Sequence, residues 1–248
     1  MQTDTAQPSV HPFHYYDWHQ TEEDRMGDSA VQTALLIYLT AVCQHMLRDV
    51  PAYVAINLNI YTARHEMQHP IAPDLAIFFG VRIDAATEQR LRSWCLYEPG
   101  RPPPAIVIEV ASESTWRNDL RDKPARYAEL GVAEYILYDP NAPALLPGGR
   151  LRLWRRAGAA LLPVPPDTRG RCWSTVLERY LVSDGAWLRL TDRDGVRCPT
   201  AEDAERAAKK AARAAEDAAR AAEDAERAAK EAAWAKLREL GIDPTTLI

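Results

Sequence analysis

IVIEVASESTWRNDLRDKPARYAEL, residues 106–130, reads as a buried strand followed by a short helix. Along the strand, alternation sends Val107 and Glu109 to one face and Ile106 and Ile108 to the other. Both faces are otherwise apolar, so the pattern predicts a strand covered on both sides. A carboxylate inside such a run is costly unless a cation or a metal compensates it. Glu109 therefore predicts a charged partner on a neighbouring element.

Lys123 is the best candidate for that partner. It is the single lysine among residues 1–199, which hold 20 arginines. Helical spacing aligns it with Leu120, Tyr127 and Leu130, on the stripe expected to face the sheet. Because Pro124 is tolerated only in a first helical turn, Lys123 lies near a helix start, where the macrodipole disfavours a cation. Two structural explanations remain open: a plain ion pair, or an ammonium that extends outwards over Tyr127.

The surrounding pattern predicts a mixed α/β fold. Val31, Leu35, Tyr38, Val42 and Met46 line one face of a helix over 29–47. Four segments, the strand quoted above included, have the length and composition of strands: AYVAINLNIYTA, APDLAIFFGV, PAIVIEVAS and AEYILYDP. Residues 150–198 resemble additional β-hairpin material of the same domain. Gly131 ends the short helix. The order favours a mixed central sheet with helices on its faces.

The last 49 residues differ in kind. RAAEDAARAAEDAERAAKEAA repeats every seven residues, and alanines from Ala204 to Ala235 alternate steps of three and four, which is a heptad seam. Glu–Arg and Glu–Lys pairs four residues apart support a helix of some 40 residues. Alanine seams bury little area, so an oligomerising coiled coil and a solitary solvated helix both remain open. Trp234 and Leu237 begin an apolar patch that favours association.

Composition excludes several functional classes. The net charge is −5, and residues 1–199 hold 21 basic against 24 acidic side chains, which argues against tight non-specific DNA binding but leaves room for a local basic rim around a cleft. Four isolated cysteines indicate a reducing compartment. With no secretory signal pattern and no long apolar run, we expect a cytoplasmic protein without a membrane partner. The expected domains are an extended arm (1–25), the α/β domain (26–199) and the alanine-rich helix (200–248).

Asp74 adds a second carboxylate, because it opens an apolar strand directly after a proline. Taken alone, it is a common turn residue. With Glu109 and Lys123 it forms a set of two carboxylates and one ammonium on neighbouring elements. Mg²⁺ uses one or two carboxylates together with waters and phosphate oxygens, and a lysine can stabilise charge on a phosphate. His65 and His69 are expected to be solvated.

PDLAIF, IVIEVASEST and DLRDKPARYAELGVAEYILYDP together resemble the Uma-two-type restriction endonucleases, a branch of the PD-(D/E)XK nuclease superfamily. The resemblance spans most of residues 20–198 and extends to the tail ending in LRELGIDP. It implies a restriction-endonuclease-like core and Mg²⁺-dependent hydrolysis of DNA, with Mn²⁺ as a substitute ion. Asp74 and Glu109 would then bind the metal and take part in catalysis. The lysine expected two residues after the glutamate is Ala111 here, and Lys123 resembles its substitute.

The resemblance also suggests Asp28 and Gln32 as additional site residues, although a helix cap explains Asp28 equally well. Ser112, Ser114 and Thr115 fall in the matching segment, and capping is their simpler role. Three functions therefore remain: a metal-dependent DNA endonuclease, a catalytically silent nuclease-fold module that binds or regulates, and an enzyme acting on RNA or branched DNA. The favoured one is the endonuclease, acting as a homo-oligomer that uses its C-terminal helix.

Overall fold

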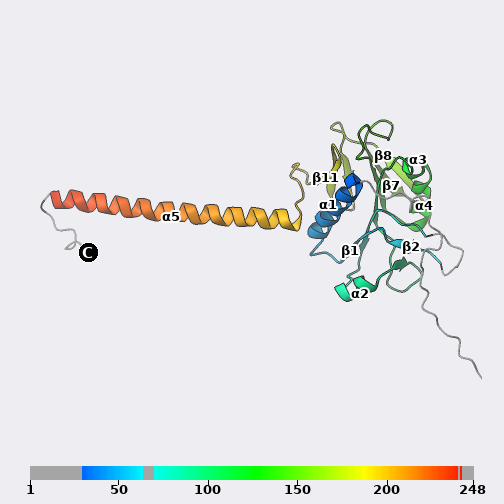
Figure 1. The fold of residues 1–248 in the computed structure, drawn as a ribbon, viewed down its shortest axis with the longest axis horizontal. Helices are drawn as coiled ribbons and strands as arrows, with labels where there is room; N and C mark the ends of the chain where they lie inside the picture. The colour runs from blue at the N-terminus through cyan, green and yellow to red at the C-terminus, as the bar shows by residue number, and fades with distance from the viewer. Residues whose placement is uncertain (1–29, 64–69, 240, 242–248) are drawn as a thin grey trace, which may run out of the picture. The chain divides into compact units, whose positions relative to one another are not determined.

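The computed structural model describes residues 30–63, 70–239 and 241. It divides into two units, one up to Thr200 and the other from Ala201 onwards. The first is built around a six-stranded sheet in the order β1-β3-β5-β6-β7-β8 (Figure 1). Those strands are Ala52–Ile56, Leu75–Phe79, Ile106–Val110, Glu134–Tyr138, Leu151–Ala157 and Ala160–Val164, respectively.

The sheet is mixed, as the sequence predicts. β5 and β6 run parallel, whereas the other neighbouring strands are antiparallel. A parallel pair needs a crossover connection, which here consists of the short helices α3 (Trp116–Arg121) and α4 (Lys123–Leu130). The single helix expected in this segment is thus divided at Asp122, with α4 beginning at Lys123 itself.

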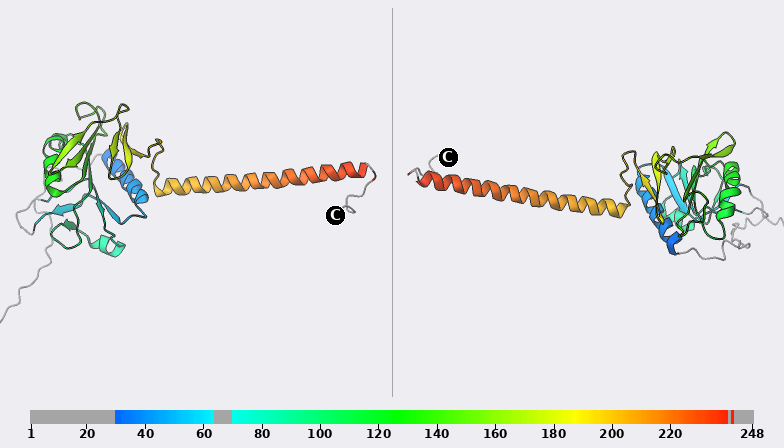
Figure 2. Two further views of the ribbon diagram at one scale, coloured as in Figure 1. Left: turned by 180° about the vertical axis from the view of Figure 1, so that it is seen from behind. Right: turned by 90° about the horizontal axis from the view of Figure 1, so that it is seen from above.

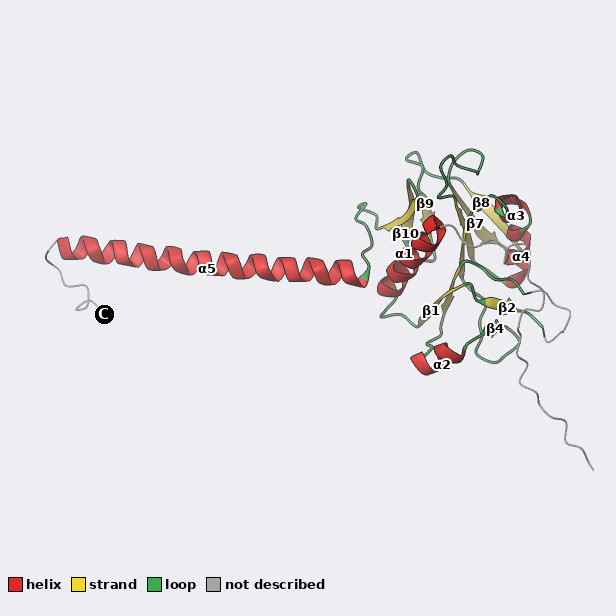
Figure 3. Ribbon diagram, in the orientation of Figure 1, coloured by secondary structure: helices red, strands yellow, loops and turns green. Residues whose placement is uncertain are grey.

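Helices lie on both faces of the sheet, α1 on one and α3 with α4 on the other (Figures 1 and 2). The helix α1 (Ala30–Met46) buries Leu35, Leu39 and Val42 against one face. The buried stripe is turned from the predicted one, because Val31 is 47% exposed while Leu36 and Cys43 are buried. Figure 3 separates these helices from the strands between them. The mixed α/β architecture is therefore confirmed.

Alternation along β5 produces two hydrophobic cores, as expected. Ile106 and Ile108 join the core beneath α1, while Val107 joins the core beneath α4. Glu109 shares the face of Val107 and therefore points toward α4. The strand thus places one carboxylate in an otherwise apolar layer.

Smaller elements complete the first unit. The segment predicted as one strand over 52–63 is two, β1 and β2 (Asn59–Tyr61), because Asn57 interrupts it with a positive φ of 48°. β2 pairs with β4 (Ser93–Cys95), and α2 is Ala85–Arg90. In the 150–198 region, β7 and β8 extend the main sheet. A separate three-stranded sheet follows, made of β9 (Cys172–Ser174), β10 (Arg179–Asp184) and β11 (Trp187–Thr191).

The second unit contains one long helix, α5, from Ala201 to Glu239. Glu202 pairs with Arg206 at 2.6 Å and Glu205 with Lys209 at 2.5 Å, both at the predicted spacing of four. No residue of α5 is buried. Among the described residues, none of the helices is long and apolar enough to cross a bilayer.

Candidate active site

The site begins with a cross-strand pair of carboxylates. β3 and β5 are antiparallel, with Leu75 opposite Ile108 and Ala76 opposite Val107. Extending this register by one residue brings Asp74 opposite Glu109 on the same face of the sheet. The Oδ2 atom of Asp74 accepts a hydrogen bond from the backbone N–H of Val110 at 2.7 Å, which anchors it at the end of β5. Two residues predicted from separate segments are therefore brought together.

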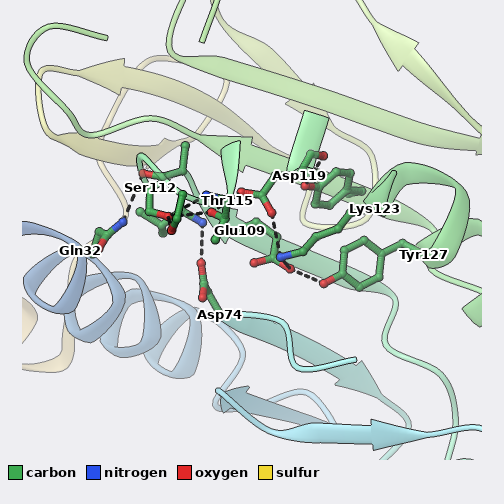
Figure 4. Close-up of polar contacts among 12 residues, drawn as sticks. Gln32, Asp74, Glu109, Ser112, Thr115, Asp119, Lys123 and Tyr127 are labelled. Carbon is green, nitrogen blue, oxygen red and sulfur yellow. Dashed lines mark hydrogen bonds and ion pairs between the residues drawn. The ribbon is translucent and has the colours of Figure 1, made fainter. Parts of the chain in front are cut away.

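Glu109 is 2% exposed and has two polar partners from α4 (Figure 4). The ammonium Nζ of Lys123 lies 3.0 Å from Glu109 Oε1. The same oxygen accepts a hydrogen bond from the hydroxyl of Tyr127, which is fully buried. Because Lys123 and Tyr127 are four residues apart on one helix, both reach the carboxylate together. The predicted contact between Lys123 and Glu109 is present, and Lys123 does not extend outwards.

Lys123 has a second carboxylate partner that the sequence analysis missed. Asp119 is 1% exposed, and its Oδ1 atom lies 2.8 Å from Lys123 Nζ. The residues are four apart across the junction of α3 and α4, a spacing at which helical side chains meet. That spacing was the available signal. It was obscured because the segment around Lys123 was interpreted as the start of a helix.

Asp119 is itself held by its neighbours. Its Oδ2 atom accepts a hydrogen bond from the hydroxyl of Thr115 at 2.8 Å, and its backbone carbonyl accepts one from Tyr135 at 2.9 Å. Thr115 in turn shares a hydrogen bond of 2.8 Å with Ser112, and its backbone N–H donates to Ser112 Oγ at 3.2 Å. Thr115 is the N-cap residue of α3 but makes no side-chain capping bond; its hydroxyl instead fixes the Asp119 carboxylate, and Ser112 holds Thr115 in place.

The electrostatics reflect burial of several carboxylates in one place. Burial, and then the charge of Glu109, hold the pKa of Asp74 well above its usual range. Burial raises the pKa of Asp119 to about 6, although Lys123 acts in the opposite direction. Burial and Glu109 also raise the pKa of Tyr127, so its hydroxyl remains a donor at neutral pH. One ammonium against three carboxylates leaves the fully ionised cluster with a formal charge of −2.

Gln32 lies in α1, on the other side of β5, and contacts the backbone just after the end of that strand. Its Nε2 atom donates to the carbonyl of Ala111 at 3.2 Å, and Asn141 Nδ2 donates to the same carbonyl at 2.9 Å. Gln32 therefore supports the backbone that follows Glu109. Asp28 falls outside the described residues, as do His65 and His69.

The donor set is suited to a hard cation with few protein ligands. Across 30–63, 70–239 and 241, the structure forms no group of three or more His, Cys, Asp and Glu side chains that could hold a metal ion. Asp74 and Glu109 nevertheless provide the one or two carboxylates with which Mg²⁺ is commonly bound, the other ligands being waters and phosphate oxygens. The residues present thus fit a magnesium ion better than an ion that needs a complete protein cage.

The mixed sheet, with Asp74 and Glu109 on neighbouring strands and Lys123 beside Glu109, is the arrangement that the resemblance to restriction endonucleases implies. The chain belongs to the Uma2 family, whose description is "Putative restriction endonuclease", because that family model matches residues 25–168, more than half of the chain. This membership places it among the nucleases, and restriction-endonuclease-like families generally use divalent metals.

One solved structure similar to the chain is that of a "putative nuclease belonging to DUF820" from Anabaena variabilis ATCC 29413. The sequence identity is 16%, with a TM-score of 0.37, and the match covers 56% of this chain and 75% of the other. A search among curated proteins found no match.

Proposed function

We propose that the protein is a metal-dependent endonuclease that hydrolyses DNA phosphodiester bonds. In this proposal Asp74 and Glu109 bind Mg²⁺, for which Mn²⁺ can substitute, and Lys123 contacts the phosphate. The observation that carries the proposal is the register of β3 and β5, which sets Asp74 opposite Glu109, together with the 3.0 Å contact of Lys123 to Glu109. Family membership supports the reaction class.

Charge balance gives the physical argument for a divalent ion. Like charges directly opposite each other in a sheet are destabilising. The single ammonium of Lys123 contacts both Glu109 and Asp119, and one positive charge does not balance three carboxylates. A divalent cation supplies the charge that balances the remaining −2. The cluster is therefore expected to favour such an ion whenever the carboxylates are ionised.

The chain's own groups have separable roles in this proposal. Tyr127 fixes the orientation of Glu109 through its hydroxyl. Lys123 offers ammonium hydrogens to a phosphate oxygen and stabilises the negative charge that develops there. Arginine is a poor substitute, because its planar guanidinium is a wider group than an ammonium that must reach one oxygen beside a metal. A bound divalent ion would activate water and polarise the phosphate.

Plasmid cleavage tests the proposal directly. Supercoiled plasmid is incubated with the protein in Mg²⁺, Mn²⁺ or EDTA, alongside the Lys123→Ala variant. We expect nicking or linearisation that requires the metal and is lost in Lys123→Ala. Asp122→Asn is the matched control, because Asp122 is exposed and next to Lys123. Absence of cleavage with either metal would contradict the proposal.

A second candidate is a catalytically silent nuclease-fold module that binds or regulates. The observation that favours it is burial: the side chains of Lys123 and Glu109 are only 8% and 3% exposed. Binding of fluorescent duplex DNA without cleavage would support this alternative. Parallel assays with single-stranded DNA, branched DNA and RNA would identify the substrate class.

We also propose that the protein is a homo-oligomer that associates through α5. The alanine seam and Trp234 lie on this helix, and none of its residues is buried within the chain. Sedimentation of the full chain is compared with that of a chain ending at Thr200. We expect the full chain to sediment as an oligomer and the shortened chain to have fewer subunits. If both sediment as monomers, the protein is not an oligomer.

A further inference from the structure

The environment of Lys123 contains more negative charge than one structural ion pair requires. Its ammonium lies 2.8 Å from Asp119 and 3.0 Å from Glu109, and both carboxylates are almost fully buried. A buried charge needs a partner, but each additional buried carboxylate has its own desolvation cost. Asp119 is therefore an expensive second partner for an ammonium that Glu109 already neutralises. A functional reason for it is worth testing.

We propose that Asp119 is a positioning residue, which holds the ammonium of Lys123 at the active site while Glu109 binds the metal ion. This inference rests on the proposed endonuclease function. It assigns Asp119 no contact with metal or substrate.

Competition at Glu109 gives the first reason. A cation bound to that carboxylate carries the same sign of charge as the Lys123 ammonium, so it weakens the 3.0 Å pair. The four-carbon stem of lysine is flexible, and an ammonium without a fixed partner loses its position. Asp119 retains the ammonium because it lies in α3, one helical turn before Lys123 and independently of the strand that carries Glu109.

The rigidity of Asp119 gives the second reason. Its other carboxylate oxygen is occupied by the Thr115 hydroxyl, and Thr115 is bonded to Ser112. Tyr135, from β6, donates to the Asp119 carbonyl. These bonds fix one carboxylate oxygen toward Lys123, which is the requirement for holding a reactive group within a fraction of an ångström.

The test compares Asp119→Asn with Asp119→Glu and with the control Asp122→Asn. Asp119→Asn keeps the shape of the side chain but removes the charge that holds Lys123. We expect kcat for plasmid cleavage to fall by about 10- to 100-fold, with a much smaller change in KM. Asp119→Glu, which restores the carboxylate, should recover part of the loss. Asp122→Asn should stay within about twofold of the unchanged protein.

Binding of Mn²⁺, measured by calorimetry, separates positioning from metal ligation. Asp119→Asn should change the Mn²⁺ affinity by less than about threefold, while Glu109→Gln should lower it by more than tenfold. An equal loss of affinity in both variants would make Asp119 a metal ligand and overturn the inference. So would cleavage by Asp119→Asn at an unchanged kcat.

A readout that needs no cleavage is the nitrogen-15 NMR signal of the lysine ammonium groups. The chain has five lysines, and only Lys123 is buried, because Lys209, Lys210, Lys230 and Lys236 lie on the exposed α5 helix. In the unchanged protein, the protected Lys123 signal should persist when Mg²⁺ is added. In Asp119→Asn it should be lost or exchange-broadened, and a signal that persists there would overturn the inference.

These outcomes also separate the two proposals. If the unchanged protein neither binds Mn²⁺ nor cleaves nucleic acid, the proposed function fails. If it does both, and Asp119→Asn cleaves at an unchanged kcat or keeps its protected Lys123 signal with Mg²⁺ bound, the positioning inference fails alone. Should Asp119→Asn fail to fold, the same signal is recorded in Asp119→Glu, where a shifted but still protected resonance is expected.

Discussion

Replacing Lys123 with methionine removes the one ammonium of the carboxylate cluster while nearly preserving side-chain volume. Glu109 and Asp119, both almost fully buried, then lose their common cation. Removing one partner of a buried ion pair typically costs about 3–5 kcal/mol, because an uncompensated charge remains. For a domain of this size, that loss lowers the midpoint of thermal unfolding by roughly 6–20 °C.

The assay is urea unfolding at pH 7.5 in EDTA, followed by tryptophan fluorescence. Lys123→Met is compared with the double variant Lys123→Met/Glu109→Gln, which removes both charges of the 3.0 Å pair. The double variant should recover part of the lost stability. A loss below about 1 kcal/mol in Lys123→Met would refute the reasoning, because it would mean that solvent or protonation already neutralises the cluster.

The same substitution should have the opposite effect on metal binding. Without the competing ammonium, Glu109 has no cationic partner and the local negative charge is larger, although Tyr127 still donates to it. Lys123→Met should therefore bind Mn²⁺ more tightly than the unchanged protein does, although it does not cleave. Saturation at 100 times the dissociation constant adds about 2.7 kcal/mol to the free energy of unfolding. Weaker binding of Mn²⁺ would show that the metal does not compete with Lys123.

Three further predictions concern Asp74, Asp119 and the end of α4 at Gly131. Asp74→Asn should leave the metal-free protein as stable or more stable, because it removes the like charge opposite Glu109, yet lower Mn²⁺ affinity more than tenfold by calorimetry. Between pH 3.8 and about 6, Asp119 keeps its proton in the metal-free folded state but has lost it in the unfolded chain. The free energy of unfolding, measured in EDTA, should therefore fall by up to about 3 kcal/mol as the pH rises through this range. A rise over that range would contradict the assigned shift. Gly131→Ala should lower the free energy of unfolding in urea by about 1–2 kcal/mol. At this helix end φ is 96°, and the added Cβ would lie 3.3 Å from Pro103. An unchanged unfolding midpoint would contradict this prediction.

The sequence was most informative in segments where the residue types repeat with one clear helical or strand periodicity. The alternation of β5 placed Glu109 correctly, and the helical spacing of Lys123 with Tyr127 predicted that the lysine faces the sheet. Both patterns depend only on local geometry. The seven-residue repeat likewise predicted the long helix α5. Whether that helix associates with a second copy stays a prediction, since its surface alone does not determine a partner.

Features set by tertiary contacts were harder to predict. The division of the 52–63 segment depends on the positive φ of Asn57, which the alternating apolar residues on either side concealed. Asp119 was missed because its place in the site depends on tertiary contacts with Lys123, Thr115 and Tyr135, which lie in different parts of the fold. A polar side chain in a charged segment such as WRNDLRDK gives no sign of being buried.

The pattern of charges in the site argues for function over stability. A structural lysine needs one carboxylate, and apolar replacements of buried ion pairs are often neutral or stabilising. Here two carboxylates contact one ammonium and a third, Asp74, lies opposite Glu109, and burial holds the pKa values of Asp74 and Asp119 above the usual range. Such an excess of buried negative charge destabilises the protein unless a cation joins it. Perturbed groups of this kind gather where binding or catalysis requires them. Under the proposed function, a divalent cation supplies the positive charge that offsets this excess, and the fold retains the carboxylates for that reason.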